Sequence, residues 1–131
     1  MKEVTVVAKN EVGSLASVAE ALGHVGVNIE AISAYGTDGN AIFRFITGDP
    51  ATATKVLSKI EGVKVREGET IIYKMINRPG ELGKLTRKLA QKGINLESIY
   101  IMTRKPDFTE IALRTVEADI PKAKEALGIK D

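Results

Sequence analysis

The sequence contains no cysteine, no tryptophan and only one histidine, His24. The lack of cysteine excludes disulfides, thiolate metal ligands and a cysteine nucleophile. A single histidine leaves too few ligands for a zinc site, and we expect neither a metal nor another cofactor. No apolar run reaches the roughly eighteen residues that a membrane-spanning helix needs, and the first ten residues do not have a signal-peptide layout. These absences predict a cytoplasmic protein that does not bind membranes.

A strong excess of one charge is also missing. The chain has 19 lysines and arginines against 17 aspartates and glutamates, and only 5% of its residues are aromatic. This balance gives no electrostatic indication of a nucleic-acid partner. The content of 44% hydrophobic and 27% charged residues is ordinary for a globular protein. A length of 131 residues allows one moderate core or two small ones.

The most informative feature is an internal repeat. The block Asn-Glu-Val-Gly-Ser-Leu at 10–15 returns as Asn-Arg-Pro-Gly-Glu-Leu at 77–82, and Gly-Val-Asn-Ile-Glu at 26–30 returns as Gly-Ile-Asn-Leu-Glu at 93–97. Both blocks recur after 67 positions, which chance does not readily produce. The repeat predicts two tandem modules, residues 1–67 and 68–131.

Each module has the same predicted order of elements. A β-rich run precedes a glycine-containing turn and an amphipathic helix, and two strands and a second helix follow. The expected strands are residues 3–8, 28–35, 41–47 and 63–66, with 70–76, 95–103 and 110–115 in the repeat. The apolar stripes of the first helices are Leu15, Val18, Ala19, Leu22 and Val25, and Leu82, Leu85 and Leu89. The second helices are expected to begin at Asp49-Pro50 and Asp119-Ile120-Pro121.

This βαββαβ order predicts an α+β fold, with two ferredoxin-like modules that have antiparallel sheets and helices on one face. The second copy is too short for a closing strand, so we expect its sheet to keep an open edge.

Polar residues that packing does not require recur in both copies. Asn10 and Gly13 lie between the first strand and the first helix, and Asn28 is expected to open the second strand; Asn77, Gly80 and Asn95 are their counterparts. The first amides of a helix, at the positive end of its dipole, form an anion site suited to a carboxylate. An asparagine side chain both donates and accepts hydrogen bonds, as an amino acid ligand requires.

The two blocks, separated by an amphipathic helix and present twice, resemble the ACT domain, a small regulatory module. The resemblance implies side-by-side pairing, a homodimer, and an amino acid bound at the interface. It also implies a non-enzymatic regulator whose partner is an amino-acid biosynthetic enzyme. The first copy has Val12 where the family usually has the proline that the second copy keeps as Pro79. The implied ligand-binding residues are Asn10, Val12, Gly13, Ser14, Leu15 and Asn28, with Asn77, Pro79, Gly80, Glu81, Leu82 and Asn95.

Three alternatives stay open. The asparagines could be turn, capping or left-handed residues without a ligand. The chain could be a regulatory small subunit like those of acetohydroxyacid synthase, although it lacks the further domain that these subunits carry. RNA-recognition modules share the topology and stack bases on sheet aromatics, but Phe43 and Phe45 are expected to face the helices.

Overall fold

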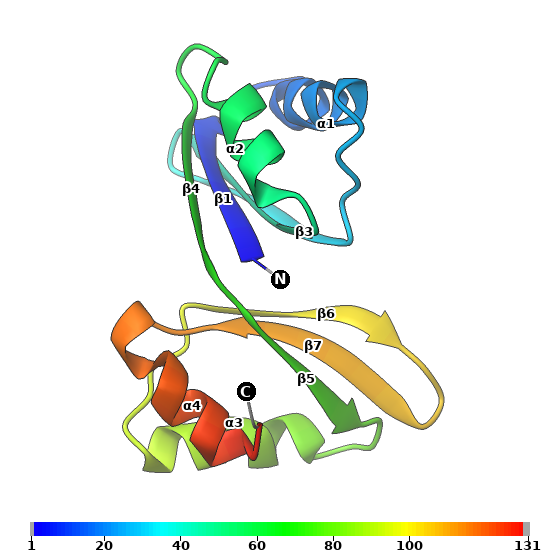
Figure 1. The fold of residues 1–131 in the computed structure, drawn as a ribbon, viewed down its shortest axis with the longest axis vertical. Helices are drawn as coiled ribbons and strands as arrows, with labels where there is room; N and C mark the ends of the chain where they lie inside the picture. The colour runs from blue at the N-terminus through cyan, green and yellow to red at the C-terminus, as the bar shows by residue number, and fades with distance from the viewer. Residues whose placement is uncertain (1, 130–131) are drawn as a thin grey trace. The chain divides into compact units, whose positions relative to one another are not determined.

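The computed structural model describes residues 2–129. The chain divides after Gly68 into two compact units, each built around its own sheet (Figure 1). Among the described helices, none is long and apolar enough to cross a membrane.

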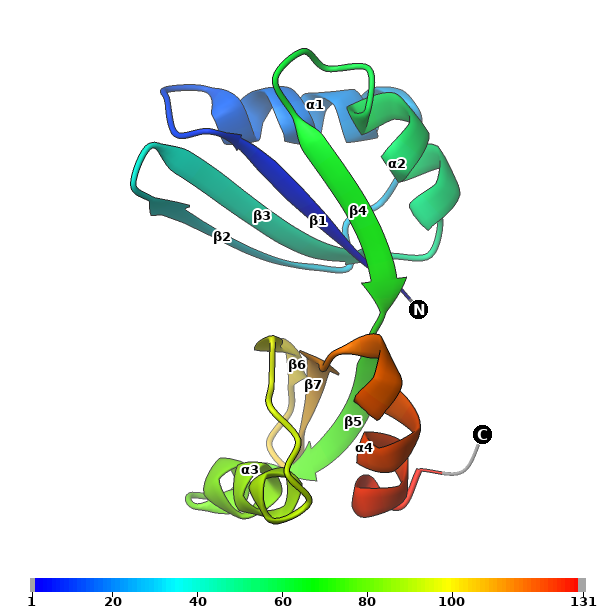
Figure 2. The same cartoon turned by 90° about the vertical axis from the view of Figure 1, so that its left-hand side faces the viewer.

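The first unit has a four-stranded sheet in the order β2-β3-β1-β4. Strand β3 pairs antiparallel with both β1 and β2. Helices α1 and α2 cover one face of the sheet (Figure 2). The elements are β1 (Lys2–Lys9), α1 (Ser14–His24), β2 (Ala31–Thr37), β3 (Asn40–Thr47), α2 (Pro50–Leu57) and β4 (Lys64–Glu69).

The second unit repeats this arrangement with three strands in the order β5-β7-β6, and β7 pairs antiparallel with both neighbours. Within residues 70–129 no further strand lies beyond β5, which is therefore an edge strand. The elements are β5 (Ile71–Ile76), α3 (Glu81–Gln91), β6 (Ser98–Arg104), β7 (Phe108–Arg114), the short 3-10 turn η1 (Glu117–Asp119) and α4 (Ile120–Leu127). The predicted α+β fold with two antiparallel ACT-type modules is confirmed.

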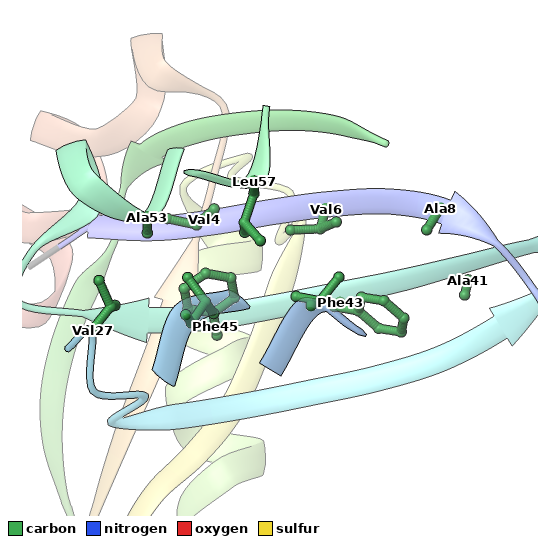
Figure 3. Packing of buried hydrophobic residues seen from close by; sticks show 11 residues of the cluster. Val4, Val6, Ala8, Val27, Ala41, Phe43, Phe45, Ala53 and Leu57 are labelled. Carbon is green, nitrogen blue, oxygen red and sulfur yellow. The ribbon is translucent and has the colours of Figure 1, made fainter. Parts of the chain in front are cut away.

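The core of the first unit lies between the sheet and its helices (Figure 3). Phe43 and Phe45 are buried there, as their alternation on β3 predicts, so neither ring is available to stack on a base. Burying a large apolar side chain contributes about 1.5–3 kcal/mol. The buried cluster of the second unit is Ile71, Leu85, Leu89, Ile94, Ile111, Leu113, Ile120, Ala123 and Leu127.

The apolar stripes of the first helices are narrower than predicted. On α1 only Val18 and Leu22 are buried, whereas Leu15 is 40% exposed. On α3, Leu82 is 50% exposed. Both leucines lie in the first helical turn, beyond the reach of the core, so they are surface residues.

Two smaller predictions about element ends were wrong. Asn28 and Asn95 do not open strands, because β2 begins at Ala31 and β6 at Ser98. Asp119 does not cap α4 with its side chain, because the 3-10 turn leads directly into that helix. Asp49 does cap α2, since its carboxylate accepts the amide of Thr52 at 3.2 Å.

Candidate functional site

The turn between β1 and α1 is held by local hydrogen bonds. Gly13 is the N-cap of α1 and has φ of 89°, a left-handed conformation that glycine adopts without strain. The amide of Ser14 donates to the carbonyl of Glu11 at 3.2 Å, and its hydroxyl donates to the carbonyl of Lys9 at 2.6 Å. These two bonds link residues 9, 11 and 14 and hold the turn locally.

The amides at the second and third positions of α1 and α3 are open, which means that they have no hydrogen-bond acceptor within residues 2–129. In α1 the first helical bond runs from the amide of Ser17 to Gly13, and within residues 2–129 the amides of Leu15 and Ala16 have no acceptor. The amides of Leu82 and Gly83 in α3 likewise have no acceptor within these residues. Such amides lie at the positive end of the helix dipole, so each turn offers two donors to an anion.

The second turn carries a charge at the first helical position, where the first turn has Ser14. Gly80 repeats the left-handed N-cap, with φ of 88°, but Glu81 replaces the serine at the first helical position. Arg78 donates to the Glu81 carboxylate, with Nη2 to Oε2 at 2.7 Å, and Lys84 lies 3.4 Å away. The hydrogen bond from Arg78, helped by Lys84, lowers the pKa of Glu81 below its ordinary value.

Asn10 and Asn77 both tie the turn to the neighbouring hairpin. The amide of Asn10 donates to Gly39 at 3.0 Å, and its side chain lies against Gly36. The amide of Asn77 donates to Asp107 at 3.2 Å, and its Nδ2 donates to the carbonyl of Lys105 at 2.7 Å. The side-chain amino group of Asn77 therefore stabilises the fold, and this contact does not use the side-chain oxygen, Oδ1.

Asn28 and Asn95 lie at the other end of their modules. Asn28 follows the C-terminal end of α1, and Asn10 precedes its N-terminal turn. Since α1 has 11 residues, the helix separates the two ends by about 16 Å. The Nδ2 of Asn28 donates to the Glu30 carboxylate at 3.4 Å. One module alone does not bring the two asparagines together.

A cavity adjoins each turn. The first measures about 400 Å³ and lies beside Ser14, on the side of the turn that faces the segment leading into β4. The second measures about 380 Å³ and lies beside Glu81, between β5 and α3. In the described part of the chain no group of acidic or histidine side chains is arranged to hold a metal ion.

Apolar side chains surround the turns. Val12 is fully exposed at the first turn, and Leu15 and Leu82 project from the first turns of their helices. Pro79 is exposed as well. Exposed apolar groups beside open amides are suited to contact with a ligand or a second protein surface.

Two tandem modules of this topology, each with a strand, a glycine turn and a helix, define a repeated ferredoxin-like protein. The family model described as the ACT domain matches residues 2–65 and again residues 70–129. The chain belongs to the ACT-domain family and carries two tandem copies of the domain.

Several known proteins resemble the chain. A structure from Bacteroides thetaiotaomicron is 25% identical, with a TM-score of 0.82 over 97% of this chain and 85% of that one. The ligand-free regulatory subunit of aspartate kinase from Thermus thermophilus has the same fold, with a TM-score of 0.70 at 16% identity over 97% of this chain and 90% of that one. The D-3-phosphoglycerate dehydrogenase of Methanocaldococcus jannaschii is 31% identical over 84 residues, which are 58% of this chain but only 16% of the dehydrogenase.

Proposed function

We propose that the chain is a non-enzymatic regulatory protein that binds a small amino acid at its two strand–turn–helix elements. The observation that carries the proposal is the repeated pair of open amides, Leu15 and Ala16 in one module and Leu82 and Gly83 in the other. These amides would bind the ligand carboxylate. The exposed leucines beside them favour a small or apolar ligand side chain.

The ammonium group of the ligand needs acceptors, and these would come from two places. Oδ1 of Asn10 or Asn77 is the near acceptor. Asn28 and Asn95 lie about one helix length away within a module, so they would reach the ligand only from a second copy of the chain. The proposal therefore includes a homodimer with the amino acid at the subunit interface.

Binding at such an interface would regulate by favouring one arrangement of the subunits, since a ligand shifts only states that it binds unequally. Membership of the ACT family and the fold shared with an aspartate kinase regulatory subunit support this role. The sequence likeness to a D-3-phosphoglycerate dehydrogenase supports it too. We propose that the regulated partner is an amino-acid biosynthetic enzyme.

The direct test is calorimetric titration of the chain with each of the twenty amino acids, together with thermal unfolding. One amino acid should bind and raise the melting temperature by mass action. Replacing any one of the four asparagines by alanine should weaken binding by about tenfold or more, because each change removes a hydrogen bond to a charged group. The single variants are Asn10→Ala, Asn77→Ala, Asn28→Ala and Asn95→Ala. His24→Ala serves as the control, because His24 is exposed at the C-terminal end of α1.

Two results would contradict the proposal. Absence of binding by every amino acid would exclude the sensor role. Binding that survives both the Asn10→Ala and the Asn77→Ala change would place the ligand elsewhere. Light scattering with and without the ligand tests the dimer separately.

A further inference from the structure

The second module has an open groove along β5. The groove has a volume of about 380 Å³ and runs between the edge strand and α3. Four of its eight lining residues are apolar or aromatic, and Ile76 at the end of the strand is 53% exposed. The lining residues are Tyr73, Lys74, Met75, Ile76, Glu81, Lys84, Leu85 and Lys88.

In the first module the equivalent position is occupied by the chain itself. Strand β4 lies beside β1, and Val63 and Val65 pack against the core of that module. The cavity beside the first turn is bounded by Ile60–Val63, the segment that leads into this strand. In the second module, residues 70–129 provide no strand beyond β5. A six-residue edge strand with an uncovered apolar flank is a template for an added strand.

The charge of the groove indicates what would bind there. Three lysines and one glutamate line it, and that glutamate is already bonded to Arg78 and Lys84. The equivalent cavity of the first module has the opposite balance, with Lys9 against Glu11 and Glu61. In the repeat, Lys74 and Lys88 stand at the positions of Val7 and Ala21, so the excess positive charge is particular to the second copy.

We propose that β5 and α3 form a docking site for an extended acidic segment of a partner protein, which adds as a fourth strand beside β5. Apolar side chains at alternating positions of the segment, in the manner of Val63 and Val65, would cover Tyr73 and Met75. Acidic side chains at its end would meet Lys84 and Lys88. Main-chain hydrogen bonds along β5 would supply affinity, and the lysines would supply the preference for an acidic sequence.

The probe is a fluorescein-labelled, capped peptide of sequence EEVTVTV, compared with KKVTVTV by fluorescence anisotropy on the full chain. The acidic peptide should bind at least tenfold more tightly, and 0.5 M salt should reduce the difference. The double variant Lys84→Glu/Lys88→Glu should reverse the preference. Lys84→Gln/Lys88→Gln, which adds no repulsion toward Glu81, should abolish it.

The matched control is Arg87→Glu/Lys92→Glu. It makes the same change in net charge on exposed residues of α3 and its C-terminal end that do not line the groove. Its affinity for the acidic peptide should stay within about twofold of the parent chain, as expected for surface charges that do not contact the peptide. Equal losses in both double variants would overturn the proposal, because they would show attraction by net charge alone. The groove variants leave the first module unchanged, so amino-acid binding at Asn10 and the open amides of α1 should persist in them.

Amide hydrogen exchange tests the strand addition itself. The acidic peptide should slow exchange at β5 amides, while exchange at β2, an edge strand of the first module, should not change. Binding without protection of β5 would contradict an added strand. Protection of β5 in the free protein that grows with protein concentration would show that a second copy occupies the edge, and would likewise overturn the proposal.

Discussion

The side chain of Asn10 lies directly against the backbone of Gly36, so close that a Cβ at position 36 would come within 2.6 Å of Nδ2. Gly36 is on β2, and the amide of Asn10 is held by Gly39 in the following hairpin turn. The hairpin therefore sets the position of the asparagine that the proposed amino-acid site uses.

This contact predicts that Gly36→Ala will displace the Asn10 side chain and weaken amino-acid binding at the first turn. We expect a loss of about tenfold, comparable to Asn10→Ala, since a displacement that breaks a charged hydrogen bond costs about as much as its removal. Gly48→Ala is the control, because a Cβ there would meet no atom within 4 Å. Calorimetry on both variants measures the effect. An unchanged affinity in Gly36→Ala would show that the Asn10 position does not matter for binding.

Two glycines at either end of α1 should respond to alanine with opposite signs. Gly13→Ala forces a side chain into a left-handed conformation and should lower the free energy of unfolding of the first module by about 1–2 kcal/mol. Gly23 is the next-to-last residue of the helix and has open space around it, so Gly23→Ala should raise that free energy by about 0.5 kcal/mol. Urea unfolding followed by circular dichroism distinguishes the two. A destabilised Gly23→Ala variant would mean that the helix is strained there.

A buried ion pair should contribute to the stability of the first module. Nη1 of Arg44 lies 3.2 Å from Oε1 of Glu3, whose side chain is fully buried. Burial opposes the charge on Arg44, but a hydrogen bond with Tyr35 and the charge of Glu3 outweigh it and raise the pKa of Arg44. Arg44→Ala should cost about 3–5 kcal/mol, the usual effect of removing one member of a buried pair.

The double variant Glu3→Gln/Arg44→Met tests whether the pair acts as a unit. It should be more stable than Arg44→Ala, because no buried carboxylate is then deprived of its cation. Urea unfolding of Glu3→Gln, Arg44→Met and the double variant completes the cycle. Additive losses would show that the two side chains do not interact.

The tandem organisation and the type of fold could be predicted from the sequence because they depend on local signals. The blocks around Gly13 and Gly80 mark the turns, and the alternation of Phe43 and Phe45 places their face of β3 against the helices. The contact of Asn10 with Gly36 joins residues 26 positions apart through strand pairing, and no local pattern encodes it.

The pairing of Glu3 with Arg44 depends in the same way on the register of β1 against β3. The apolar stripe of α1 did not predict the exposure of Leu15, for a different reason. Periodicity identifies a helical face, but it does not show how far along the helix the sheet covers that face.

The charge of Glu81 should limit ligand affinity at the second turn. Glu81 stands at the first position of α3, and its carboxylate is charged at neutral pH, as that of an ordinary glutamate is; the lowered pKa extends this charge to lower pH. A negative charge beside the open amides of Leu82 and Gly83 repels the carboxylate of a ligand, whereas Ser14 is neutral. Glu81→Ser should raise affinity at the second turn by about fivefold, the effect of one nearby charge in water.

Arg78→Gln separates this charge effect from the local hydrogen bonds. It should raise the pKa of Glu81 toward its ordinary value, which NMR titration of the carboxyl carbon measures directly. Since the folded pKa is lowered, the stabilisation by this pair is present above the unfolded pKa and is lost as pH falls through the folded pKa. Lys88→Gln, one turn further along α3, should leave the Glu81 titration unchanged. If Arg78→Gln leaves it unchanged as well, the arginine is not the cause of the lowered pKa.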